Sequence, residues 1–357
     1  MKPHNGKPPS QQGGFSLIEI MVGLAIGLLA TLVIVQVISD FESQKRVTTG
    51  TADAQTNGSI TLHSIGRDVR MASYALLPTG SPGVPDSPLE CATLTENGVA
   101  VDPAVNLSPV TIVDGGPGGS DTITMRSGNS PRGGTPSVIS GPPIGNVVTV
   151  ANNFGCETGD TTLIISGNIC AISSASAVSA TINTSITLQN VTGVVAGANL
   201  ACLGTWSVIT YSVVNGNLNI TTNGGVPAPD MAGIVDLQAQ YGISATGNSN
   251  AIVQWVDATG AWAAPTVADR NRIKAVRLAV VARNPKREAI AVTTVCTNAD
   301  TPGLSGLCAW QGNAVSPAPA INLAANDADW LRYRYRVFET ILPLRNVVWA
   351  GGPKGTL

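Results

Sequence analysis

An apolar run near the N-terminus constrains this chain more than any other feature. Residues 15–38 read FSLIEIMVGLAIGLLATLVIVQVI, and Glu19 is the only charged residue among them. As a helix this run is about 36 Å long, which is enough to cross the roughly 30 Å of hydrocarbon in a bilayer. The preceding residues 1–14 are polar and contain Lys2, Lys7 and three prolines, which disfavour a helix there. We therefore expect a membrane-spanning helix behind a polar leader.

The apolar run can be interpreted as a secretory signal or as a membrane anchor, and neither interpretation explains Glu19. A secretory signal has a shorter apolar core, followed directly by a cleavage site of small residues. The run here is longer, and no such cleavage site follows it between Gln36 and Gln44. A plain membrane anchor accounts for the length of the run but leaves a carboxylate in a lipid environment. An ionised group is costly there and needs a partner, so Glu19 is a candidate functional residue.

The residues around Glu19 resemble a known sequence motif. Residues 13–19, GGFSLIE, resemble the prepilin site of type IV pilins, a Gly-Phe junction followed by Ser or Thr, Leu and a glutamate. The resemblance implies cleavage between Gly14 and Phe15, methylation of the new Phe15 amine, and a role for Glu19 in assembly. In that family the glutamate is thought to meet the N-terminal amine of a neighbouring subunit. Such a pair would relieve most of the cost of burying the anion in a helix bundle.

The helix is expected to continue past the membrane as an amphipathic segment. Small and apolar residues recur at spacings of three and four with no proline between them, as on one face of a helix. They are Val47, Thr51, Ala54, Gly58, Leu62, Ile65, Val69 and Ala72. Because Gly50 and Gly58 each cost a helix about 1 kcal/mol relative to alanine, packing against the rest of the protein should hold this part.

A second family resemblance lies where this helix should end. Residues 67–74, RDVRMASY, resemble the segment that closes the long helix in the PilW family of type IV minor pilins, with Ser73 in place of the usual glycine. The exit from the helix is therefore expected to differ locally. We expect Arg67, Asp68 and Arg70 to form solvated ion pairs at a helix end, worth under about 1 kcal/mol each, and not to act in catalysis.

The rest of the chain is expected to form a β-rich body. Charged residues are only 12% of the chain, while Gly, Ser, Thr, Asn and Val are abundant, which favours short strands and turns. Turn clusters alternate with β-branched runs at 122–125, 147–150 and 161–165. A hairpin is predicted over 206–222, because Asn215-Gly216 accepts positive φ at both central positions of its turn.

Two later segments extend the resemblance to the PilW family. Residues 233–242, GIVDLQAQYG, and residues 338–346, FETILPLRN, resemble stretches of that family. In relatives the loop after the first stretch often carries several aspartates that suit a calcium ion. Residues 244–250 contain no acidic residue here, so we predict no metal in this loop.

Two strands are predicted near the C-terminus. Residues 273–283, IKAVRLAVVAR, read as a half-buried strand with Arg277 and Arg283 on its wet face. Residues 331–337 alternate as well, and place three arginines on one face. These are Arg332, Arg334 and Arg336. We interpret this row as a device for solubility and edge protection, and not as a patch for DNA or an acidic partner.

The cysteines indicate disulfides and hence an oxidising compartment. They contain no C-x-x-C pair, and the chain has only two histidines to join them around a metal. Fifteen complete pairings are possible, and proximity along the chain makes Cys156 with Cys170 and Cys296 with Cys308 the natural guesses. The six candidates are Cys91, Cys156, Cys170, Cys202, Cys296 and Cys308.

Several function classes are disfavoured. The formal net charge is -2, so the strong positive field of a nucleic-acid-binding protein is absent. His63 is the only histidine left after cleavage of the leader, and no G-x-S-x-G or comparable nucleophile context accompanies it. The glycine-rich run at 115–120 lacks the lysine and the helix of a phosphate loop. We predict no cofactor and no enzymatic activity.

These observations predict an α+β, type IV pilin-like protein with a long N-terminal helix and a large β-rich body. Its parts would be a cleaved leader over 1–14, a helix over 15–73 that first crosses the membrane and is then amphipathic, and a body over 74–357. The body would lie in the periplasm before assembly and on the cell surface afterwards.

The resemblance to the PilW family implies a role in starting pilus assembly, at or near the tip. It implies as partners other minor pilins, the major pilin, the prepilin peptidase and the inner-membrane assembly platform. Two alternatives stay open at this point. One is a type II secretion pseudopilin, which shares the processing site and the long helix, and the other is a membrane-anchored periplasmic adhesin or hydrolase.

Overall fold

The computed structural model describes residues 14–76, 88–116, 118–180, 185–296, 306–313, 315–319 and 321–350. All of the predicted leader except Gly14 lies outside these residues. The chain divides into two compact units, residues 1–50 and residues 51–357.

One helix, α1 (Leu17–Met71), contains 55 residues and belongs partly to each unit. Within the first unit its apolar side chains are exposed, and no part of its most apolar window, with a mean hydropathy of 2.6, is buried. By length and composition it is the one helix in the described part of the chain that could cross a membrane. The predicted long helix is therefore confirmed, with its ends within two residues of those expected.

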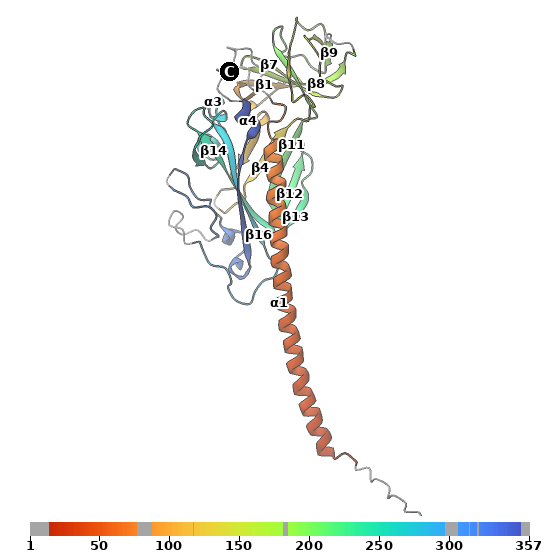
Figure 1. Ribbon diagram of the computed structural model, residues 1–357, viewed down its shortest axis with the longest axis vertical. Helices are drawn as coiled ribbons and strands as arrows, with labels where there is room; N and C mark the ends of the chain where they lie inside the picture. The colour runs from red at the N-terminus through yellow and green to blue at the C-terminus, as the bar shows by residue number, and fades with distance from the viewer. Residues whose placement is uncertain are drawn as a thin grey trace, which may run out of the picture. The chain divides into compact units, whose positions relative to one another are not determined.

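The second unit begins with the amphipathic part of α1. Ala54, Ile65, Val69 and Ala72 are each 4% exposed or less, and they share one hydrophobic core with strands of two β-sheets. The predicted stripe at spacings of three and four is buried at Ala54, Gly58, Ile65, Val69 and Ala72, and half-buried at Val47, Thr51 and Leu62. Figure 1 shows this part of α1 beside β4 and β11, so the sheets hold the helical segment that its own glycines weaken.

A five-stranded antiparallel sheet has the order β13-β12-β11-β4-β3. The predicted hairpin is confirmed as β11 and β12, joined by Asn215 and Gly216 at φ 52° and 72°. Pro229 lies in the edge strand β13, where a missing N–H is tolerated. The strands are β3 (Val110–Val113), β4 (Thr122–Ser127), β11 (Ser207–Val214), β12 (Asn217–Thr222) and β13 (Ala228–Ala232).

A four-stranded antiparallel sheet has the order β15-β14-β16-β17. Its strands are β14 (Ile234–Ser244), β15 (Ile252–Val256), β16 (Ile273–Arg283) and β17 (Tyr335–Pro343). The prediction that residues 273–283 are half-buried is wrong: β16 is central, and every residue before Arg283 is buried. The other late strand begins at Tyr335 and not at residue 331, because Trp330–Arg332 form a short 3-10 helix.

The remaining strands form an eight-stranded sheet with the path β2-β1-β8-β7-β10-β5, to which β9 and β6 are added through β8. Its pairs are antiparallel except β1 with β8. In Figure 1 it lies beyond the C-terminal end of α1. Its strands are β1 (Thr93–Glu96), β2 (Val99–Val101), β5 (Pro136–Val138), β6 (Val147–Thr149), β7 (Thr161–Ser166), β8 (Ile169–Val178), β9 (Ser185–Leu188) and β10 (Asn199–Gly204).

Short helical turns connect these sheets. The α-helical ones are α2 (Pro103–Asn106), α3 (Val267–Arg270) and α4 (Arg345–Ala350), and the 3-10 turns are η1 (Pro88–Glu90), η2 (Gly260–Trp262), η3 (Leu323–Ala325) and η4 (Trp330–Arg332). The predicted α+β class, a long helix with a β-rich body, describes the observed architecture.

Candidate assembly site

The expected processing junction lies just before α1. Gly14 and Phe15 are exposed, and Phe15 keeps 81% of its accessible surface. The first intrahelical hydrogen bonds are donated by the N–H groups of Glu19 and Ile20 to the Ser16 carbonyl, at 3.0 and 3.2 Å. The bond between Gly14 and Phe15 therefore lies in non-helical backbone.

Glu19 lies in the first turn of α1. Its carboxylate makes no hydrogen bond or ion pair with any residue that the structure describes. The positive end of the helix dipole favours an acidic residue there, by about 0.3–1 kcal/mol. Around it Leu17, Ile18 and Ile20 are 77%, 69% and 54% exposed. The single chain thus presents an apolar helical surface with one carboxylate near its end, a surface that needs lipid or other helices to cover it.

The other end of the helix is anchored by a buried carboxylate. Asp68 accepts a hydrogen bond of 2.8 Å from the Tyr211 hydroxyl on β11, and its other oxygen lies 2.8 Å from Nε of Arg67. Asp68 and Tyr211 are 7% and 1% exposed. The expectation that Asp68 belongs to a solvated helix end is therefore wrong, although Arg67 itself reaches solvent. This contact fixes the end of α1 to the five-stranded sheet.

The helix exit uses two left-handed residues. Ser73, which stands where the resembled segment has glycine, has a φ of 66°, and Ala75 has a φ of 68°. The Ser73 N–H donates to the Arg126 carbonyl at 2.9 Å. A β-carbon at Gly128 would overlap the Leu203 carbonyl and approach the Ala75 side chain to 2.9 Å. The predicted local difference is thus one of strain, because Ser73 keeps a conformation that glycine adopts freely.

Two buried acids lie where β14 meets the segment before β4, and one of them, Asp121, connects the two. Asp121 accepts hydrogen bonds from the N–H groups of Gly115 and Ala239, at 2.9 and 2.7 Å. Burial raises the pKa of Asp121 to about 7, against the lowering effect of these two donors. Asp236 accepts from Nε2 of Gln238 at 3.0 Å, and burial raises its pKa to about 6. Both carboxyls are buried in the body, with Asp121 3% and Asp236 5% exposed.

Arg277 was expected on the solvent-exposed face of β16, but it is buried. Its Nε donates to Oε1 of Gln240 at 2.7 Å, and a terminal nitrogen donates to the Pro317 carbonyl at 3.0 Å. Its guanidinium lies 5.0 Å from the Trp255 ring and 4.3 Å from the Trp310 ring. Burial lowers the pKa of Arg277 to about 10. The arginine is an interior residue clamped by two aromatic rings.

The arginine row does not form one exposed stripe. Arg334 pairs with Glu288 at 3.1 Å, and Arg332, which precedes β17, lies 3.8 Å from Asp329. Arg336 is the row's one member within β17. Only one of the three arginines therefore lies in the edge strand, and the interpretation of the row as edge protection stays a prediction.

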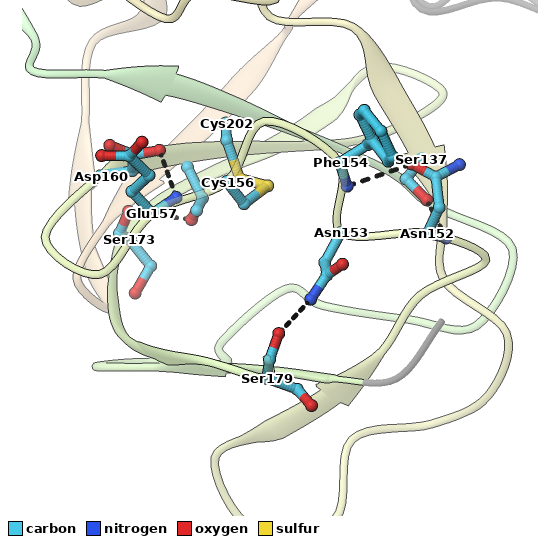
Figure 2. The surroundings of a disulfide bond; sticks show 11 residues. Ser137, Asn152, Asn153, Phe154, Cys156, Glu157, Asp160, Ser173, Ser179 and Cys202 are labelled. Carbon is cyan, nitrogen blue, oxygen red and sulfur yellow. Dashed lines mark hydrogen bonds between the residues drawn. A yellow bond between two sulfur atoms is a disulfide. The ribbon is translucent and has the colours of Figure 1, made fainter. Parts of the chain in front are cut away.

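The disulfides correct one of the two guessed pairings. The bonds are Cys91–Cys170, Cys156–Cys202 and Cys296–Cys308. The last joins neighbours in sequence, as expected, but Cys156 is bonded to Cys202 on β10 and not to Cys170. Figure 2 shows the loop before Cys156, where Asn153 donates to the Ser179 carbonyl at 2.7 Å. This loop is thereby fixed to the eight-stranded sheet.

An open groove lies between α1 and β17. It has a volume of about 270 Å³ and is lined by Ser59, Leu62, His63, Gly66 and Arg70 of the helix and by Phe338, Thr340 and Leu342 of the strand. His63 is exposed on its rim. Sequence reasoning placed His63 on the helix but missed the groove, because the pairing of a distant strand with the helix leaves no local signal.

No group of three or more potential metal ligands occurs among the residues described by the structure. In the loop that follows β14, the Gly247 carbonyl accepts a hydrogen bond of 2.8 Å from the ammonium group of Lys274. Lys274 is 2% exposed. A cationic side chain of the protein itself thus occupies this position in the loop.

Two family models match separate parts of the chain. Residues 207–346 match the family model of Type IV Pilus-assembly protein W, and residues 9–35 match that of the prokaryotic N-terminal methylation motif. No curated protein matches. Among solved structures, the type IV-like pilin TTHA1219 from Thermus thermophilus is similar, with 12% identity, a TM-score of 0.35, and coverage of 82% of this chain and 96% of that one.

Proposed function

We propose that this chain, in which residues 207–346 match the PilW family model and residues 9–35 the N-terminal methylation motif, is a PilW-family minor pilin. We propose that it takes part in initiating pilus assembly, at or near the pilus tip. The observation that supports this proposal is that one helix combines two features. A prepilin-type N-terminus opens an exposed apolar helix, and that helix is anchored by Asp68 in a body that matches the family. The proposed role is structural and not enzymatic.

The N-terminus is proposed to be processed before assembly. Cleavage between Gly14 and Phe15 would remove the leader over 1–14, and methylation would modify the Phe15 amine. The exposure of both residues and the start of the helix at Leu17 support this step, since the peptide bond lies outside the helical hydrogen-bond ladder. The match to the methylation motif supports the same assignment.

Glu19 is proposed to set the register between subunits. When the apolar part of α1 leaves lipid for a filament, one apolar surrounding replaces another, so hydrophobic burial contributes little net free energy. The free energy that favours the filament over the lipid-embedded state then comes from two sources. One is the pairing of the Glu19 carboxylate with the methylated amine of a neighbouring subunit, and the other is close packing of the helices. An unpaired anion in such a bundle would be expensive.

The proposed position near the tip follows from the size of the body. Residues 88–204 precede the segment that matches the family and contain the whole eight-stranded sheet. A bulky addition is tolerated at the end of a filament better than in every layer of a helical array. The proposed partners are other minor pilins, the major pilin, the prepilin peptidase and the inner-membrane assembly platform, with the body in the periplasm before assembly.

Mass analysis of the protein from its native host tests the proposal. We expect a mature chain that begins with a methylated Phe15, and we expect Glu19→Ala to remove the protein from sheared surface pili. Glu42→Ala, which removes a carboxylate from the same helix beyond its apolar run, is the matched control and should assemble normally. An intact Met1 on the functional protein would contradict the proposal. Loss of protein secretion with normal pili in a deletion strain would favour a secretion pseudopilin.

A further inference from the structure

One edge of the strand β17 is not paired with any strand in the described part of the chain. β17 is the last strand of the four-stranded sheet, and β16 is its one partner among the described strands. The Asn284 N–H donates to the Arg334 carbonyl in the register that pairs Arg283 with Tyr335. Hydrogen-bonded and non-bonded pairs alternate in an antiparallel ladder, so the even-numbered residues of β17 bond to β16. The odd-numbered residues direct their N–H and C=O groups away from the sheet. They are Tyr335, Val337, Glu339 and Ile341.

These outward backbone groups have no hydrogen-bond partner among the residues that the structure describes. The opposite edge of the same sheet differs, because the Trp255 N–H of β15 donates to the Ser316 hydroxyl at 3.0 Å. Protein edges are usually blunted by prolines, charges or covering segments. On β17 the only proline is the last residue, Pro343, and the charged residues are Arg336 and Glu339. Ile341, between Glu339 and Pro343, is an apolar side chain that is 58% exposed.

The groove of about 270 Å³ lies along the helix-facing side of this edge. Its floor is apolar, formed by Leu62, Phe338 and Leu342, and Gly66 contributes no side chain that would fill it. Its rim carries Arg70 and His63, and no acidic residue lines it. The groove can therefore hold an apolar side chain and, beside Arg70, a carboxylate.

We propose that β17 receives an added strand from another pilin subunit, and that alternate side chains of this strand, one apolar and one acidic, enter the groove. The inference rests on the proposed function, because it names the surface through which a minor pilin holds its neighbour. An added strand runs about 4.8 Å from β17, and every second side chain faces α1. Main-chain hydrogen bonds supply affinity in this mode of binding, and pockets for alternate side chains supply specificity.

Photo-crosslinking of the full chain in its native host tests this surface. A photoreactive p-benzoylphenylalanine replaces His63, and the crosslinked peptide is mapped by mass spectrometry. We expect a peptide of another pilin in which an apolar and an acidic residue stand two positions apart. A peptide from the N-terminal helix of a pilin, or from a second copy of this chain, would overturn the proposal.

Two pairs of variants separate the backbone and the charge contributions. Ile341→Pro removes an outward N–H without touching a bond to β16, and should lower the crosslink yield about tenfold. Ile341→Ala is its control and keeps the yield, since it retains the N–H. Arg70→Glu should lower the yield, whereas Arg70→Lys should preserve it. Arg70 is exposed, so its replacement does not endanger folding if the proline variant misfolds.

The outcomes distinguish this inference from the function on which it rests. Leader cleavage and recovery of the chain in sheared pili are measured in the same cells. If Ile341→Pro and Arg70→Glu are processed and recovered, and both crosslink at the wild-type level, the docking edge is refuted and the minor pilin role stands. If the wild-type chain keeps its leader and is absent from pili, the proposed function itself fails.

Discussion

Two glycines of α1 that face β17 should respond oppositely to the same substitution. Gly66→Ala would place its β-carbon 3.5 Å from Cδ2 of Leu342, an ordinary van der Waals contact. Gly58→Ala would place its β-carbon within the ring of Phe338. The helix-forming advantage of alanine over glycine is the same at both sites. The comparison therefore isolates the packing of the helix against the strand.

The magnitudes follow from these contacts. Alanine gains about 1 kcal/mol over glycine inside a helix, so Gly66→Ala should raise the unfolding free energy by about that amount. At Gly58 the same gain is offset by an overpacking cost of about 1–3 kcal/mol, because the Phe338 ring must move. We expect Gly58→Ala to lower the unfolding free energy by about 1 kcal/mol. At about 2 °C per kcal/mol for a large domain, the two variants should differ by roughly 4 °C in melting temperature.

Thermal unfolding of the full chain in detergent micelles, followed by near-UV circular dichroism, measures this difference. Phe338→Leu is introduced into both the wild type and Gly58→Ala, and we expect the alanine to be less harmful when the ring is absent. Equal stabilisation by Gly58→Ala and Gly66→Ala would refute the reasoning. It would mean that the ring of Phe338 does not rest on the helix at Gly58.

Three further predictions concern the interior of the body. Tyr211→Phe removes the hydroxyl that donates to Asp68 and should lower the unfolding free energy by about 2 kcal/mol; an unchanged midpoint in urea would argue against this anchor. Ser73→Gly should raise the unfolding free energy by about 0.5–1 kcal/mol, because relief of left-handed strain exceeds the entropic cost of glycine, and a lower melting temperature would contradict it. The raised pKa values of Asp121, about 7, and Asp236, about 6, mean that the folded state holds these protons more tightly than the unfolded state. Their stabilising contribution is therefore present below about pH 4 and is lost as the pH rises through 6 to 7, so melting temperatures measured from pH 4 to 8 should fall less steeply in Asp121→Asn than in the wild type.

The sequence predicted the elements whose formation depends on residues close together in the chain. The apolar run and the stripe of small residues identified α1, because helical periodicity is written in consecutive residues. Asn215-Gly216 identified the turn between β11 and β12, because few residue pairs accept its positive φ values. The processing residues Gly14, Phe15 and Glu19 were found through a short motif, and their roles stay predictions.

Features that depend on long-range pairing escaped prediction. The wet face assigned to β16 is covered by Trp255 and by Trp310, whose distance along the chain from Arg277 gives no local sign of contact. Cys156 is bonded to Cys202, which lies on β10 and is close to Cys156 in space although 46 residues away in sequence. Proximity in sequence had favoured Cys170. The burial of Asp68 required the Tyr211 hydroxyl, which no spacing around the helix end could reveal.

Two disulfides cross-link the eight-stranded sheet and its own loops. They are Cys91–Cys170 and Cys156–Cys202, and one hydrophobic core of the sheet consists only of residues within 139–202. This core therefore contains no residue of the segment that matches the family, whereas the sheet's other core also includes Ala75 and Leu76 after α1. Substitutions within residues 139–202 can consequently reshape this sheet while the separate core shared by α1 and the other two sheets stays unaltered.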